Sequence, residues 1–262
     1  DELSPEVVDP IVLSLESVNR TLLSSPIAKA GKHTLNAVPS ILSNKTYDDV
    51  APCGATMLCG ANPFSTGELK ATYANTYVIG AYHPYCEIEG LKYCWRATSN
   101  DFVSDLGIAG LIKLLPVVGQ FFNHTYSNEA TLLRAKTEDQ VLGAPFWENG
   151  GGLLFVHHML PHPTGTGETR SLAIEYNQNV IAAAEFVNKV QQKLKTHFGN
   201  DFALIVISDH PLRSMWCEKS PYSGADCSRD TPVEGDWVPF IVSAPKGTQV
   251  QMPSTMIGVL AE

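Results

Sequence analysis

The sequence predicts a single α/β domain with a central, mostly parallel or mixed sheet and helices on both faces. Short apolar runs typical of strands alternate along the chain with helical segments, and this alternation is typical of a sheet covered by helices. A chain of 262 residues is long enough to bury one large core. No internal repeat or low-complexity segment divides it. We therefore expect residues 1–262 to form one domain.

The expected elements are read from the apolar period and the flanking turn residues. Strands are predicted at 11–15, 76–82, 152–157, 202–207 and 237–243. Helices are predicted at 35–43, 102–115, 128–136 and 170–197, with a cysteine-containing loop over 51–66. The helix at 170–197 has the clearest pattern, because apolar residues such as Leu172, Val180 and Leu194 recur at three- and four-residue steps and form one face.

Three of the predicted strands end in acidic or imidazole side chains. The strand at 11–15 leads to Glu16, the strand at 202–207 leads to Asp209 and His210, and the strand at 152–157 is followed by three histidines. Ligands of open α/β sheets gather at such strand ends, and carboxylate with imidazole is a donor set suited to zinc or manganese. Each residue alone could be a helix cap, a packed histidine or a solvated loop residue. Their coincidence favours a metal site.

These motifs, taken in order, resemble the sulfatase and alkaline phosphatase superfamily, and within it the membrane-anchored phosphoethanolamine and phosphoglycerol transferases. The segment HTLNAVPSILSN at 33–44 resembles the family's Thr-x-x-x-Val-Pro-x-x-Phe/Leu-Ser stretch. Ser-Asp-His at 208–210, His-Pro at 162–163 and Val-Pro-Phe at 238–240 resemble three further family motifs. The resemblance implies an alkaline phosphatase-like fold with one sulfatase-like catalytic domain.

The resemblance also assigns roles to six residues. It implies a divalent metal held by Glu16, Thr34, Asp209 and His210, with Thr34 as the nucleophile. Zinc is the metal expected first, with manganese and magnesium as alternatives. It implies that His162 binds the substrate phosphate and that His157 matches a second histidine of the phosphoethanolamine branch. Only one of the neighbours His157 and His158 can point into the site if the strand pattern continues, and the spacing favours His157.

The implied activity is transfer of a phosphoryl-linked headgroup, of the phosphoethanolamine or phosphoglycerol type. The donor would be a phospholipid or another phosphodiester, the intermediate a phosphorylated Thr34, and the acceptor a component of the cell envelope. The resemblance implies association with a membrane through an N-terminal anchor missing from this sequence. The expected location is the periplasm or the extracellular side of the membrane.

The chemistry of Thr34 agrees with this role. A threonine hydroxyl is a poor nucleophile at neutral pH and needs a metal or a base to activate it. A helix that begins at Thr34 would aim its first N–H groups and the positive end of its dipole at a phosphate. The alternative is that Thr34 only caps the helix over 35–43.

The sequence departs from the family at several points. Pro211 stands where the family has glycine, no histidine follows His210, and Glu16 and Thr34 are unusually close in the chain. Two alternatives therefore stay open: a phosphodiesterase or phosphatase that uses water as acceptor, and a non-catalytic protein that binds a phosphorylated ligand. A formylglycine sulfatase is disfavoured, because no Cys/Ser-x-Pro-x-Arg motif lies near Thr34.

The cysteine content and the net charge indicate which cellular compartment and which kinds of partner to expect. None of the six cysteines has the Cys-x-x-Cys spacing of a zinc ribbon or redox motif. Local disulfides are the simplest arrangement and indicate an oxidising compartment, with six reduced cysteines as the alternative. The close pairs are Cys53/Cys59, Cys86/Cys94 and Cys217/Cys227. A net charge of −9 without a basic stripe argues against nucleic acid as a partner.

Overall fold

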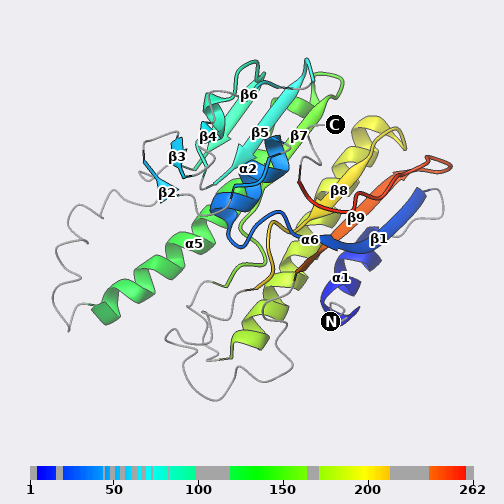
Figure 1. Cartoon of the computed structure of the whole chain (residues 1–262). Coiled ribbons are helices and arrows are strands. Elements are labelled where there is room, and N and C mark those ends of the chain that lie inside the picture. The colour runs from blue at the N-terminus through cyan, green and yellow to red at the C-terminus, as the bar shows by residue number, and fades with distance from the viewer. Residues whose placement is uncertain are drawn as a thin grey trace.

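The computed structural model shows a mixed α/β chain that contains a parallel sheet, two antiparallel sheets and two long helices (Figure 1). The predicted α/β class is confirmed at this level. The structure describes the following residues: 5–15, 20–43, 45–47, 51–53, 57–60, 64–65, 69–71, 73–81, 83–97, 119–163, 171–212 and 236–257.

The parallel sheet has the strand order β6-β5-β7. Its strands are β5 (Thr76–Gly80), β6 (Tyr93–Arg96) and β7 (Leu153–His157), with β5 fully buried in the centre. In the register of β5 with β7, Thr76 pairs with Leu153 and Gly80 with His157. β5 and β7 confirm the strands predicted at 76–82 and 152–157, and His157 lies at the C-terminal end of the sheet.

Helices cover both faces of this parallel sheet. Tyr77 and Ile79 of β5 pack against α5 (Gly119–Leu142) and α6 (Leu172–Phe198) in a cluster with Phe186 and Val190. Val78, which points to the other face because successive strand residues alternate, packs against Val38 of α2 (Thr34–Ser43). The helices predicted at 35–43, 128–136 and 170–197 are therefore present, and the layered arrangement expected from the alternating pattern holds for this sheet.

The second large sheet is antiparallel and has the order β1-β9-β8. It contains β1 (Arg20–Ala28), β8 (Leu204–Ile207) and β9 (Trp237–Pro245), so the strands predicted at 202–207 and 237–243 are confirmed. β1 was not predicted. β8 pairs with β9 and not with β7, and the described strands therefore form separate sheets in place of one central sheet.

The buried side chain of Arg20 ties β1 to the chain that enters β8. Its Nη2 atom donates to the carbonyl oxygens of Phe202 at 2.6 Å and Ser243 at 2.8 Å, and its Nε atom donates to Ser243 Oγ at 2.7 Å. Its Nη1 atom donates to the Asn200 carbonyl at 3.3 Å, and the guanidinium lies over the Phe202 ring. The hydrogen bonds that a buried guanidinium requires are thus made mainly with backbone carbonyls.

Helix α2 lies between the two sheets, as Figure 1 shows. Its Val38 side chain belongs to the cluster that covers the parallel sheet, whereas Ile41 packs with Ile27 and Phe240 of the antiparallel sheet. The segment predicted as a cysteine loop next to α2 contains a small antiparallel sheet of β2 (Ala51–Pro52), β3 (Met57–Cys59) and β4 (Phe64–Ser65). Because α2 contacts both sheets, its first residue is held at a fixed place between them.

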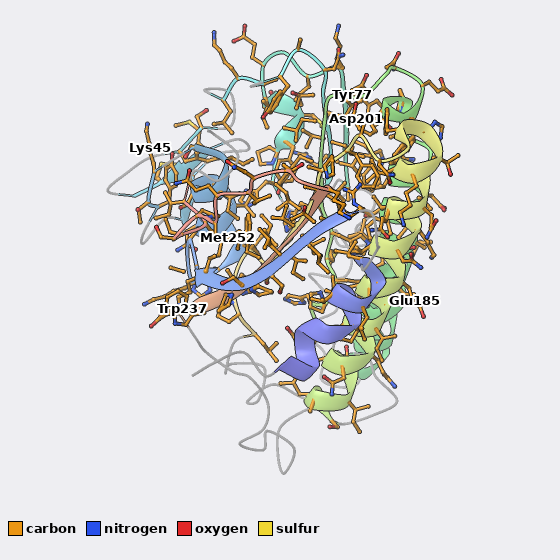
Figure 2. The ribbon with its side chains drawn as sticks, turned by 90° about the vertical axis from the view of Figure 1, so that its right-hand side faces the viewer. Lys45, Tyr77, Glu185, Asp201, Trp237 and Met252 are labelled. Carbon is orange, nitrogen blue, oxygen red and sulfur yellow. A yellow bond between two sulfur atoms is a disulfide. The ribbon has the colours of Figure 1, made fainter. Side chains whose placement is uncertain are left out.

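The strand predicted at 11–15 is wrong, because these residues belong to the helix α1 (Pro5–Leu15). A short apolar run fits a buried strand and a buried helix equally well. The contact with α6 favours the helix over the strand. Leu15 is fully buried, and its carbonyl accepts a hydrogen bond from Gln191 Nε2 of α6 at 3.3 Å. Figure 2 shows α1 alongside α6. Leu13, on the opposite side of α1, is 65% exposed.

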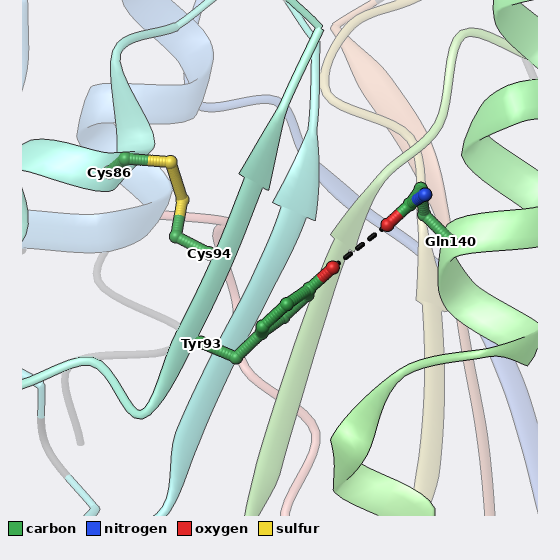
Figure 3. The surroundings of a disulfide bond; sticks show 4 residues. All are labelled: Cys86, Tyr93, Cys94 and Gln140. Atoms are coloured by element: carbon green, nitrogen blue, oxygen red, sulfur yellow. Dashed lines mark hydrogen bonds between the residues drawn. A yellow bond between two sulfur atoms is a disulfide. The ribbon is translucent and has the colours of Figure 1, made fainter.

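Two of the three expected disulfides are present. Cys53 is bonded to Cys59, and Cys86 is bonded to Cys94 next to β6 (Figure 3). Cys217 and Cys227 lie outside the described residues, as does the helix predicted at 102–115. Among the helices of the described part, none combines the length and the apolar character needed to span a bilayer.

Candidate active site

The N-terminus of α2 places Thr34 as its first helical residue. The first bond of the helix runs from the Ala37 N–H to the His33 carbonyl at 2.8 Å, so His33 occupies the capping position. Asn36 Oδ1 reaches back and accepts from the His33 N–H at 3.0 Å, as in one half of a capping box. The cap is thus made without the Thr34 hydroxyl, and the alternative that Thr34 only caps this helix is wrong.

Gly31 permits the close approach of the chain to this helix end. A Cβ atom at Gly31 would lie 2.5 Å from Asn36 Oδ1 and 2.8 Å from the Ala37 nitrogen. Both distances are shorter than any normal contact of a methyl group. A larger residue at position 31 would therefore displace the cap and the first turn that carries Thr34.

Thr34 meets the Asp-His pair that follows β8. The Thr34 Oγ1 atom lies 3.2 Å from His210 Nε2, across 176 residues of sequence. His210 Nδ1 lies 2.7 Å from the Pro211 carbonyl, which can only accept, so we assign the ring hydrogen to Nδ1. His210 Nε2 then carries a lone pair that faces the Thr34 hydroxyl. This is the geometry of a nucleophile and a base within hydrogen-bond reach.

Asp209 is a half-buried carboxylate between imidazoles, and its Oδ2 atom is shielded from water. One oxygen, Oδ1, accepts from the His210 N–H at 3.0 Å, and the other, Oδ2, lies 3.6 Å from His210 Nε2 without a hydrogen-bond partner. Burial raises the pKa of Asp209, but His210, His157 and the Thr34 hydroxyl together lower it by more. The Asp209 pKa therefore lies below its ordinary value, and the side chain is an anion at neutral pH.

His157, at the end of β7, points toward the same place. Its Nδ1 atom lies 3.0 Å from the Ala81 carbonyl and 2.7 Å from the Tyr85 hydroxyl. Burial lowers the pKa of His157, whereas Asp209 and the Ala81 carbonyl raise it in part, and the net shift is downward. The ring is thus neutral at pH 7. Gly80 allows Tyr85 to reach it, because a Cβ atom there would lie 2.8 Å from the Tyr85 ring.

The three histidines that the sequence assigned to the site share one hydrogen-bond pattern. His157, His162 and His210 each direct Nδ1 to a backbone carbonyl, at 3.0, 2.7 and 2.7 Å respectively. A carbonyl at Nδ1 fixes the tautomer and leaves the Nε2 lone pair for a metal, a proton or a ligand. His158 has the opposite pattern, because its Nδ1 atom accepts from the Leu160 N–H at 3.1 Å.

His158 faces away from this group, as expected for a neighbour of His157 in a strand. Its ring stacks on Phe186 of α6 with 4.7 Å between centroids. Burial lowers the pKa of His158 to about 4, and the nearby Arg134 contributes to the shift. His158 is therefore a neutral packing residue at the α6 interface.

The described hydrogen bonds of His162 join its loop to two helices. The backbone carbonyl of His162 accepts hydrogen bonds from Arg134 and Asn179. Its ring nitrogen Nδ1 forms a hydrogen bond with the Pro163 carbonyl. The structure thus brings together Thr34, His157, Asp209 and His210. His162 is held in the loop after β7, and Glu16 directly follows α1 and lies outside the described residues.

His83 belongs to the group and was missed in the sequence. Its Nε2 atom donates to the Thr34 carbonyl at 2.9 Å, and its ring lies 6.4 Å from that of His157. Burial lowers the pKa of His83 to about 4, with the Thr34 carbonyl opposing the shift. The available signal was an imidazole three residues after the buried strand β5.

The side chains that meet at Thr34 are of types that bind divalent metals. The buried Asp209 Oδ2 atom without a hydrogen-bond partner, the His210 Nε2 lone pair and the Thr34 hydroxyl converge on one another. Across the described ranges, no cluster of three or more His, Cys, Asp or Glu side chains is arranged to hold a metal ion. The donor set there contains two such residues, because the third predicted one, Glu16, is outside those ranges.

The chain was compared with protein-family models, curated proteins and solved structures. No family model, no curated protein and no solved structure matches the chain.

Proposed function

We propose that the protein is a metal-dependent phosphotransferase that moves a phosphoryl-linked headgroup from a phospholipid or related phosphodiester to an acceptor in the cell envelope. The observation that carries the proposal is the contact between the Thr34 hydroxyl and His210 Nε2 at 3.2 Å. A hydroxyl at the start of a helix, beside an imidazole lone pair and a half-buried carboxylate, supports nucleophilic attack on an anionic phosphorus centre.

The first half-reaction uses the residues of the Thr34 group. The hydroxyl proton of Thr34 passes to a solvent water, because His210 Nε2 would be a metal ligand, while Oγ1 forms a bond to phosphorus. The bond from phosphorus to the leaving alkoxide breaks, and that alkoxide takes up a proton. The first N–H groups of α2 stabilise the charge on the phosphoryl oxygens.

The second half-reaction reverses these roles. An acceptor hydroxyl loses its proton to solvent and attacks phosphorus, the bond to Thr34 Oγ1 breaks, and Oγ1 takes up a proton. His157, whose ring interacts with Asp209, binds a departing or entering oxygen in this proposal. His162 binds a phosphoryl oxygen in this proposal. Water in place of the acceptor would make the same site a phosphodiesterase.

Glu16, Thr34, Asp209 and His210 would hold the metal, for which zinc is the first choice and manganese or magnesium the alternatives. When bound, it supplies Lewis-acid stabilisation and lowers the pKa of the hydroxyl. The orphaned Asp209 Oδ2 atom supports this assignment.

An alkaline phosphatase-like fold and an extracytoplasmic location are part of the proposal. The parallel sheet with helices on both faces, and a nucleophile at the N-terminus of α2, support the fold. The disulfides Cys53–Cys59 and Cys86–Cys94 support an oxidising compartment such as the periplasm or the outer side of a membrane.

The test is turnover of a chromogenic phosphodiester and the matching phosphomonoester, with added zinc or manganese and with a chelator. We expect metal-dependent cleavage of the diester in the presence of an alcohol acceptor, and a loss of about a thousandfold or more in Thr34→Ala. Thr34→Ser is the matched variant, because it keeps the hydroxyl.

Each result separates the alternatives. Retained turnover in Thr34→Ala would exclude Thr34 as the nucleophile. Transfer to the alcohol without hydrolysis identifies a transferase, whereas release of the monoester in water alone identifies a hydrolase. A folded protein that binds no metal and cleaves neither ester under any condition would contradict the proposal and leave the non-catalytic binding protein.

A further inference from the structure

The loop that carries His162 is held by two side chains from different helices. Arg134 of α5 donates from Nη2 to the His162 carbonyl, and Asn179 of α6 donates from Nδ2 to the same carbonyl at 3.2 Å. Asn179 Nδ2 also lies 3.4 Å from the Pro161 carbonyl. Two helices and the loop between them therefore meet at one backbone oxygen.

Asn179 uses both ends of its amide in this contact. Its Oδ1 atom accepts from Arg134 Nη1 at 3.0 Å, while Nδ2 donates to the loop. Asn179 is 8% exposed, so these bonds are shielded from water. Of the common side chains, aspartate has the shape of asparagine but not its N–H donors, and leucine has neither donor nor acceptor.

The backbone contact determines the direction of the His162 ring. The ring is bound through Nδ1 to the carbonyl of the next residue, Pro163, at 2.7 Å. Its orientation thus depends on the conformation of the same loop segment that Arg134 and Asn179 hold. The main chain of His162 is further fixed by its own N–H, which donates to the Met159 carbonyl at 2.9 Å.

We propose that Arg134 and Asn179 are positioning residues that present His162 Nε2 to the phosphoryl group of the substrate. This inference rests on the proposed function for the role of His162. The two residues do not contact substrate. They act through the backbone of the loop, in the manner of the groups that orient metal and catalytic histidines from behind.

The experiment compares Asn179→Asp with the wild-type protein by two independent readouts. The first is the ¹⁵N spectrum of the histidine rings in protein labelled at histidine, with His162 assigned from His162→Gln. Ring ¹⁵N shifts report the tautomer directly. The second is turnover of the chromogenic phosphodiester, together with inhibition by inorganic phosphate.

The expected result is selective. In Asn179→Asp the His162 resonances shift or broaden, while those of His157 and His210 keep their positions. KM and the inhibition constant for phosphate rise about tenfold, and kcat changes less, because a binding contact is misplaced while the nucleophile is intact. Arg134→Lys is the second variant, since it keeps the charge and loses the paired donors.

Tyr93→Phe is the matched control. It removes a 2.8 Å hydrogen bond between Tyr93 Oη and Gln140 Oε1 (Figure 3), which also involves α5 but neither Arg134 nor the His162 carbonyl. It is expected to leave the histidine spectrum and KM unchanged. An equal KM effect in Tyr93→Phe would overturn the proposal, because a general loosening of α5 would then explain the result.

The two hypotheses fail in different ways. Unchanged His162 resonances in both Asn179→Asp and Arg134→Lys would overturn the positioning role, whatever the kinetics. Shifted resonances in a protein whose wild type neither cleaves the ester nor binds phosphate would confirm that the two residues hold His162 and would reject the proposed function. If Asn179→Asp does not fold, the same readouts on Arg134→Lys decide.

Discussion

Replacement of Arg20 by methionine tests how the strand that leads to Asp209 and His210 is held in place. Methionine keeps much of the side-chain length and the packing on Phe202 but has no donor. Three buried acceptors, the carbonyls of Phe202 and Ser243 and the Ser243 hydroxyl, then lose the hydrogen bonds that Arg20 donates. Arg20 is 7% exposed, so water cannot readily replace these bonds.

The expected loss follows from counting those acceptors. An unsatisfied buried acceptor costs about 1 kcal/mol or more, and three of them give roughly 3 kcal/mol. Removal of the buried charge offsets part of this cost, because the guanidinium no longer has to be desolvated. We therefore expect the free energy of unfolding to fall by about 2–3 kcal/mol in Arg20→Met.

The assay is urea unfolding under non-reducing conditions, followed by tryptophan fluorescence and far-UV circular dichroism. Lys70→Met is the control, because its ion pair with Glu89 at 3.2 Å lies on the surface and should contribute less than about 1 kcal/mol. A loss in Arg20→Met no larger than that in Lys70→Met would refute the reasoning. A changed slope with denaturant would instead indicate an altered unfolded or native state.

Three further predictions follow from single contacts. In Gly31→Ala the new methyl group collides with the Ala37 nitrogen, so we expect a loss of stability of about 1–3 kcal/mol in urea unfolding and lower turnover; unchanged values would contradict the close approach. His158 has a pKa of about 4 when folded and about 6.5 when unfolded, so the unfolded state binds more protons below pH 6.5 and stability falls as the pH drops. His158→Phe should remove about 2 kcal/mol of the stability difference between pH 7 and pH 5, and an identical pH dependence in both proteins would disprove the assignment. Replacement of Cys86 and Cys94 by serine opens a short loop and should lower stability by roughly 2–3 kcal/mol, measured against wild type without reductant.

The sequence correctly predicted the elements whose hydrophobic pattern and flanking residues together fit one type of secondary structure. The helix α6 has a long apolar stripe, and β5, β7, β8 and β9 are apolar runs between turn residues. The apolar run of α1 was assigned to a strand, because a run of that length fits both structures. Its structure is determined by the contact with α6, in which Gln191, 176 residues later in the sequence, donates a hydrogen bond to the Leu15 carbonyl.

β1 illustrates a different limit. Its sequence, RTLLSSPIA, has no regular alternation and contains a proline, so the local pattern does not indicate a strand. The strand forms because each of its residues pairs with one in β9, from Arg20 with Pro245 to Ala28 with Trp237. Such pairing between distant segments is not visible in local periodicity.

The candidate site was predictable where a side chain follows a strand or begins a helix. Thr34, His157, Asp209 and His210 all occupy such places, and the structure brings them together. His83 was missed because it joins the group through tertiary contacts, such as its hydrogen bond to the Thr34 carbonyl. No spacing in the sequence relates position 83 to position 34.

The ring nitrogen that each histidine offers depends on a feature that sequence does not contain. His157 and His158 are adjacent and chemically identical, yet a carbonyl meets Nδ1 of the first and an N–H meets Nδ1 of the second. The first arrangement leaves an Nε2 lone pair on a ring that interacts with Asp209, and the second leaves a neutral ring stacked on Phe186. Because strand alternation turns the two rings to opposite faces, only one of them meets the Thr34 group. The backbone around each ring, more than the presence of an imidazole, therefore determines which histidines can take part in phosphoryl transfer.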